Sequence, residues 1–178
     1  KGNFSIINDK AGGNIQIMQQ DGLNFSGGLE YKNNKLYLQN LKGFGQDFES
    51  IIDLNFNTEN SLLSGEGKIK AETLQALKSS LPFLKEGDGA FDLNLRLSSP
   101  DNKNQRLQIK GKVAGLDTPF MACDLVKLDL RSDDLWNVKI SPSIINLYSL
   151  SIDDFIVQSI GFNVNSEENG FKIDSIIA

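Results

Sequence analysis

Few side chains in this sequence could do chemistry. The 178 residues contain no histidine and a single cysteine, Cys123. Ser-His and Cys-His nucleophilic pairs are therefore impossible, as is a metal site built from histidine or from several cysteines. Cys123 has no partner for an internal disulfide, and we interpret it as a small apolar residue of the core. The sequence predicts no catalytic residue, no metal ion and no organic cofactor.

Two acidic pairs, Asp133-Asp134 and Asp153-Asp154, have the residue types of catalytic carboxylates or calcium ligands. Neighbouring residues on a strand point to opposite faces of a sheet, so such a pair does not converge on one ligand. Both pairs also stand beside predicted turns, where aspartate is common. We interpret them as solvated turn residues and expect a protein that is not an enzyme.

Composition excludes several classes of partner. The net charge is −5, and no segment concentrates Lys or Arg, so nucleic acid is not expected to bind. No run approaches the roughly 18 consecutive apolar residues of a membrane span. Because the sequence begins at Lys1 without an initiator Met, we expect residues 1–178 to be a single β-rich segment excised from a longer chain.

The dominant pattern is an alternation of apolar and polar residues with a period of two. Ile52, Leu54 and Phe56 alternate with polar residues between 48 and 57, and a similar run spans residues 91–98. Such alternation is typical of a sheet with one apolar and one solvated face, which favours antiparallel pairing. About a dozen strands are predicted. The adjacent Ile144 and Ile145 blur the alternation, so the strand phase between residues 144 and 152 stays open.

One segment breaks this period. Leu74, Leu77 and Leu81 are spaced three and four apart, which predicts a short amphipathic helix at about residues 72–81 that divides two β halves. Pro82 would end the helix. Gly65 and Gly67 thin one face of the preceding strand, and we expect the helix to dock there as a plug on a curved sheet. The alternative is a helical crossover packed on an ordinary β-sandwich.

Three sequence features resemble the AsmA-like family of bacterial envelope proteins (the AsmA, TamB and YhdP type). Residues 23–47, LNFSGGLEYKNNKLYLQNLKGFGQD, read as a hairpin that ends at a glycine-containing break. Residues 62–99, LLSGEGKIKAETLQALKSSLPFLKEGDGAFDLNLRLSS, read as a strand, a Leu-rich helix and an alternating strand. Residues 107–117, LQIKGKVAGLD, are similar to the glycine-punctuated strand that follows in this family.

The resemblance implies a long, curved and mostly antiparallel sheet, an open groove or partly closed β-taco, that binds or conducts phospholipid between the inner and outer membranes and supports outer-membrane biogenesis. It implies a periplasmic location, tethered to the inner membrane through a part of the chain not present here. The partner would be phospholipid or another acyl-chain lipid, with envelope proteins as further candidates. The residues predicted to line the groove are Phe25, Leu29, Ile52, Leu54, Phe56, Phe91, Leu93, Leu95, Ile109 and Val113.

A second interpretation stays open. The same apolar face could be the closed core of a β-sandwich that is structural or that recognises a protein or a glycan, without any lipid. Period-two alternation does not distinguish these two folds, because both need one apolar face on each strand.

Overall fold

The computed structural model describes residues 2–7, 10–18, 24–45, 47–73, 88–137, 139–167 and 170–177. Glu72 and Thr73 follow a strand without helical structure. The rest of the helix predicted at about residues 72–81, with Leu74, Leu77 and Leu81, lies outside the described residues. No described segment forms a helix long and apolar enough to cross a membrane.

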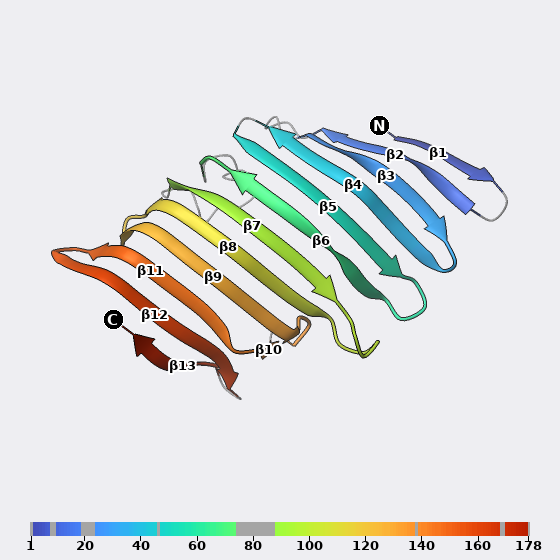
Figure 1. Ribbon diagram of the computed structural model, residues 1–178. Helices are drawn as coiled ribbons and strands as arrows, with labels where there is room; N and C mark the ends of the chain where they lie inside the picture. Colours follow the sequence, from blue (N-terminus) through green and yellow to red (C-terminus); the bar gives the residue numbers. More distant parts are fainter. Residues whose placement is uncertain are drawn as a thin grey trace.

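The described strands belong to a single antiparallel sheet (Figure 1). The first six are β1 (Gly2–Ile7), β2 (Lys10–Met18), β3 (Asn24–Lys32), β4 (Lys35–Gly45), β5 (Phe48–Asn57) and β6 (Leu62–Ala71). The others are β7 (Asp88–Ser98), β8 (Arg106–Asp117), β9 (Ala122–Asp134), β10 (Lys139–Ile140), β11 (Ser143–Ile152), β12 (Phe155–Glu167) and β13 (Gly170–Ile177). Each strand pairs with its neighbours in chain order, except that the short β10 lies off this path beside β9.

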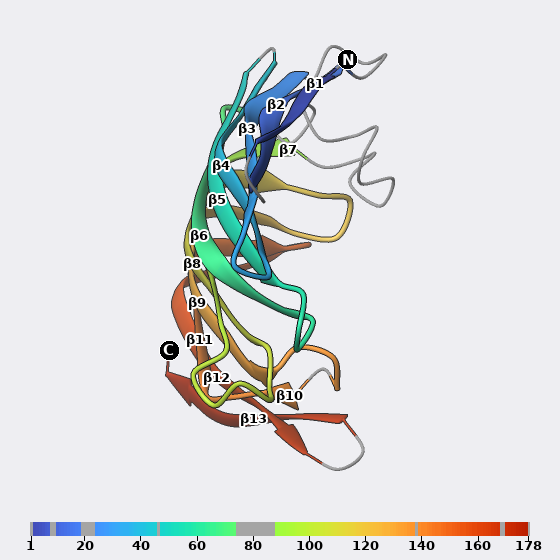
Figure 2. The same cartoon turned by 90° about the vertical axis from the view of Figure 1, so that its right-hand side faces the viewer.

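The sheet is bent into an arc when it is viewed from the side (Figure 2). In the described part of the chain it is open, since β1 pairs only with β2 and β13 only with β12. The predicted fold class, a mainly β and mostly antiparallel curved sheet, is confirmed. The two packed sheets of a sandwich are not found among the described strands.

Residues with left-handed backbone angles change the alternation at specific positions. Gly115 in β8 and Ser149 in β11 adopt left-handed φ angles of 61° and 53°. As a result Leu147 and Leu150, three residues apart, both pack in one apolar cluster. Ile144 lies half exposed on the opposite face from Ile145, because they pair with Asp129 and Leu128 respectively. This explains why the strand phase between 144 and 152 could not be assigned from the sequence.

The buried core is small and lies at one end of the strands. One cluster contains Phe48, Ala71 and Phe91, at the start of β5, the end of β6 and the start of β7. The second contains Cys123, Val126 and Leu150, at the start of β9 and the end of β11. Cys123 is buried, in agreement with its interpretation as an apolar core residue. Because neighbouring strands run antiparallel, the start of one strand lies beside the end of the next, and both clusters lie toward the same end of the strands.

At the opposite end of the strands, a buried side-chain amide hydrogen-bonds the backbone of β6 and β7. Gln105, which is 0% exposed, precedes β8. Its Oε1 accepts the Leu63 N–H at 2.7 Å, and its Nε2 donates to the Leu63 carbonyl at 2.9 Å and to the Ser98 carbonyl at 3.2 Å. The side chain thus makes both hydrogen bonds that a neighbouring strand would make with Leu63, at the point where β7 has ended.

Glycines on the apolar face make room for side chains of adjacent strands. A Cβ on Gly67 would lie 3.0 Å from Ile52 Cγ1, and one on Gly111 would lie 3.0 Å from Leu93 Cδ2. The space over Gly67, predicted to receive the helix, therefore accommodates Ile52 of the neighbouring strand. On Gly111 the added atom would also overlap the Asp92 carbonyl oxygen, and this backbone atom has little freedom to move.

We expect Gly111→Ala to lower the free energy of unfolding by about 1–3 kcal/mol, because the methyl group overpacks β7 against β8. The matched control is Gly28→Ala, whose Cβ would meet nothing closer than the Gln39 oxygen at 3.7 Å. That control should stay within about 0.5 kcal/mol of the wild type. Urea unfolding of both variants measures the difference, and equal stabilities would contradict the close approach at Gly111.

Replacing Gln105 with Leu should cost about 2–4 kcal/mol, since it leaves the N–H and the carbonyl of Leu63 unpaired in a buried position. The exposed Gln39, substituted in the same way, serves as the control and should change stability by under about 0.5 kcal/mol. Hydrogen exchange at the Leu63 amide gives a direct second measurement, and unchanged protection in Gln105→Leu would refute the role of the side chain.

Candidate functional site

The strand register places all ten residues of the predicted groove lining on one face of the sheet. Leu54 pairs with Leu38, Leu95 with Ile109, and Phe91 with Val113, so apolar side chains stand beside one another across the strands. We call this surface the apolar face. The residues on it that the sequence prediction named are Phe25, Leu29, Ile52, Leu54, Phe56, Phe91, Leu93, Leu95, Ile109 and Val113.

Four of these residues pack within the buried clusters. Phe91 is 5% exposed, and Phe25, Leu93 and Val113 pack against its cluster. The Phe25 ring meets Phe48 edge-on, with centroids 6.3 Å apart and an interplanar angle of 68°. These four residues therefore stabilise the sheet, and Phe91 has too little free surface to contact a ligand.

The other six residues belong to neither cluster and are half-buried. We call them the open patch. They lie on β3, β5, β7 and β8, away from the end that carries the core: Leu29, Ile52, Leu54, Phe56, Leu95 and Ile109. No second layer of described residues covers them.

The prediction did not include several residues of the same face. Leu38 pairs directly with Leu54, Leu107 with Leu97, and Leu128 with Ile145. The alternation of Leu38, Leu97 and Leu107 with polar neighbours is visible in the sequence and could have found them. Ile145 could not be found in this way, because the adjacent Ile144 blurs the alternation.

One polar atom interrupts the apolar face. Ser50 is 4% exposed and pairs with Gly43 and Ile69 across the strands. Its Oγ has no hydrogen-bond partner among the described residues. The hydroxyl group reduces the stability of the face, because a buried donor and acceptor are left without partners.

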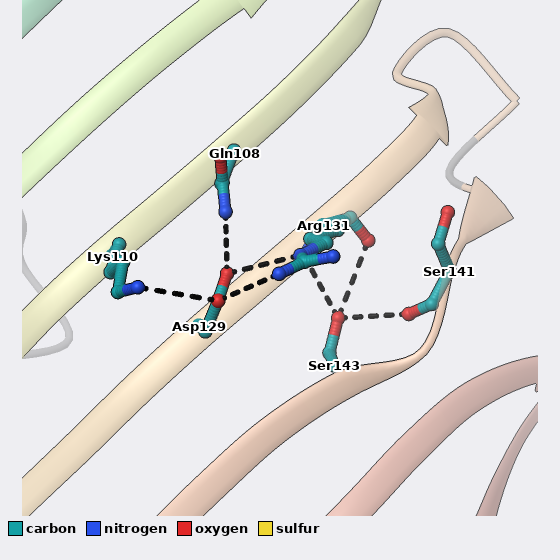
Figure 3. A network of polar contacts seen from close by, with 6 residues as sticks. All are labelled: Gln108, Lys110, Asp129, Arg131, Ser141 and Ser143. Atoms are coloured by element: carbon teal, nitrogen blue, oxygen red, sulfur yellow. Dashed lines mark hydrogen bonds and ion pairs between the residues drawn. The ribbon is translucent and has the colours of Figure 1, made fainter.

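The opposite face, which we call the polar face, carries the charged groups. Asp129 accepts hydrogen bonds from Arg131, at 3.2 and 2.9 Å, and from Gln108 at 2.7 Å (Figure 3). The Arg131 hydrogen bonds lower the pKa of Asp129, with a further contribution from Gln108, although desolvation opposes the shift. Asp129 is therefore an ionised structural group at neutral pH.

The two acidic pairs do not form a site. Asp153 and Asp154 form the exposed turn between β11 and β12, as predicted. Asp134 accepts hydrogen bonds from Asn137, which lower its pKa, while Asp133 lies 3.7 Å from Arg106. Within the described ranges no three Cys, Asp or Glu side chains are grouped so that they could hold a metal ion.

Comparison with known proteins gives no assignment: no family model, no curated protein and no solved structure matches the chain.

The Asp129 network leads to a pH prediction. A carboxylate with a lowered pKa in the folded state stabilises that state above its unfolded pKa of about 3.9, and loses the contribution as the pH falls through the folded value. We expect Asp129→Asn to lower stability at pH 7 by roughly 0.5–1 kcal/mol, and the difference from wild type to shrink below about pH 4. Urea unfolding at pH 7 and pH 3 tests this, and a difference that grows in acid would contradict it.

Proposed function

We propose that the chain binds phospholipid, or another acyl-chain lipid, on its apolar face and has no enzymatic activity. The observation that carries this proposal is an apolar face that continues across a single open sheet, with the open patch left uncovered by the described residues. Soluble monomers rarely expose apolar patches larger than a few hundred Å² unless the patch binds something.

The energetics favour an acyl chain as the ligand. Each methylene group removed from water contributes about 0.8 kcal/mol, so about ten methylenes could contribute about 8 kcal/mol before the cost of ordering the chain. The leucine and isoleucine side chains of the open patch offer no polar contacts in fixed positions. A long flexible acyl chain needs no such contacts and therefore fits this surface.

Curvature supports the same ligand. Side chains converge on the concave side of a bent sheet and spread apart on the convex side. On the apolar face Phe25 of β3 reaches Phe48 of β5 across the intervening Gly43, whereas on the polar face Ile51 stays 50% exposed. We therefore assign the apolar face to the concave side of the arc, where an acyl chain would contact more than one strand at once.

The resemblance to AsmA-like proteins suggests the biological setting. The open curved antiparallel sheet has the form that this resemblance implied. On this basis the chain is a periplasmic segment, tethered to the inner membrane by another part of the protein, that helps phospholipid move toward the outer membrane. Envelope proteins are further candidate partners.

A structural or protein-interaction role is the second candidate, and one observation favours it. Within the described part of the chain, β1 and β13 each pair on one side only. An edge strand of this kind can accept a strand from another protein through backbone hydrogen bonds. This role needs no lipid, so lipid binding distinguishes the two candidates.

The test is a substitution in the open patch. We expect Leu54→Asp to abolish lipid that co-purifies with the protein, while stability falls by only about 1–2 kcal/mol, because a carboxylate on an uncovered face keeps access to water. Leu93→Asp should instead cost several kcal/mol, because Leu93 packs against the buried cluster. Native mass spectrometry measures the bound lipid, and urea unfolding measures stability.

The matched control is Ile51→Asp, on the same strand as Leu54 but on the polar face and 50% exposed. It should retain both lipid and stability. Absence of lipid from the wild-type protein, after purification without detergent, would refute the proposal and leave the structural role.

A further inference from the structure

The polar face contains an open hollow of about 560 Å³ in which lysine side chains gather. It spans β6, β7, β8, β9 and β11, on the opposite side of the sheet from the proposed lipid surface. Its charged lining residues are Lys68, Lys110, Lys112, Lys127, Asp92 and Asp129. The side-chain amides of Asn94 and Asn146 complete the polar lining. A local excess of positive charge is unusual in a chain whose net charge is −5.

Two of the lysines oppose each other directly. Lys112 of β8 pairs with Lys127 of β9 in the strand register, so their Cβ atoms are close neighbours on one face. Like charges in this arrangement destabilise a sheet. Lys127 places its Nζ 5.0 Å from the centre of the Tyr148 ring, which attracts a cation but does not neutralise it.

The two carboxylates of the hollow lie closest to cations other than Lys112 and Lys127. Asp92 pairs with Lys112 in the strand register, but its ion pair, at 3.3 Å, is with Lys68. Asp129 binds Arg131 at 2.9 Å, with Lys110 farther away at 3.9 Å (Figure 3). Within the described part of the chain, neither Lys112 nor Lys127 has a carboxylate within ion-pairing distance. The hollow therefore has two adjacent ammonium groups without an ion-pair partner among the described residues.

We propose that this hollow binds a phosphate group carrying close to two negative charges, as a phosphomonoester does. Such a group neutralises both lysines at once and has several acceptor oxygens for their N–H groups and for the amides of Asn94 and Asn146. Lysine suits this ligand, because it contacts phosphate as a compact charge without a fixed geometry. The phosphate could belong to a soluble compound or to a lipid headgroup.

The first experiment is thermal unfolding with inorganic phosphate as the probe, compared with sodium chloride at equal ionic strength. Saturating phosphate should raise the melting temperature of the wild type by roughly 2–4 °C more than chloride does. Lys112→Gln should lose this increase. Its melting temperature without phosphate should stay close to that of the wild type, because the substitution removes both the repulsion from Lys127 and the attraction of the paired Asp92.

Lys42→Gln is the matched control, since Lys42 is an exposed lysine on the polar face of β4, outside the hollow. It should retain the full response to phosphate. An equal response in wild type, Lys112→Gln and Lys42→Gln would show only the general effect of phosphate on protein stability and would overturn the proposal.

A second experiment identifies the source of the phosphate. Wild type and Lys112→Gln are tested by flotation with vesicles of phosphatidylcholine alone and with added phosphatidic acid, whose headgroup is a phosphomonoester. Extra binding to phosphatidic acid that Lys112→Gln loses would support a headgroup. A response to soluble phosphate without this preference would support a soluble compound. Leu54→Asp should leave the phosphate response unchanged, so failure of the lipid proposal can be distinguished from failure of this one.

Discussion

The strand register is the constraint on which the rest of the structure depends. One row of paired residues crosses seven strands and is apolar throughout: Phe48, Ala71, Phe91, Val113, Val126, Leu147 and Ile160. The adjacent row, one residue away on each strand, contains no large apolar side chain: Glu49, Lys70, Asp92, Lys112, Lys127, Asn146 and Gly161. A slip of one residue toward this adjacent row would put a charged or polar group into the apolar row in each of these strands except β12, so the apolar face favours the observed pairing.

A sheet with one layer can stabilise only part of such a face. The two buried clusters lie near one end of the strands, where the left-handed backbone angles of Gly115 and Ser149 bring apolar residues three apart onto the same side. At the other end Gln105 supplies backbone-like hydrogen bonds to Leu63 instead of apolar packing. The open patch lies between these two regions, so the fold is stabilised at both ends of the strands while no described residue forms a second layer over Leu54 and its neighbours.

The sequence predicted the apolar face well because period-two alternation and strand pairing obey the same geometry. It could not predict which residues are buried: Phe91 and Leu95 alternate identically, but only Phe91 lies in a cluster. Burial depends on which strands meet at the level of the core, and a pattern within one strand does not contain that information. Gln105 could not be recognised either, since its role follows from the point at which β7 ends relative to β6.

The polar face was predicted only as a solvated surface, yet it depends on the same register. Because the apolar rows determine how β8 pairs with β9, Lys112 cannot move away from Lys127 by a shift of the strands. A one-residue shift of β9 that relieved this repulsion would turn Val126 toward the solvent, and burial of a valine side chain contributes about 1.5–3 kcal/mol. Exposed like charges across a strand pair cost far less, roughly 0.2–1 kcal/mol. The fold therefore retains the two lysines side by side, and the proposed anion would relieve their repulsion without altering the sheet.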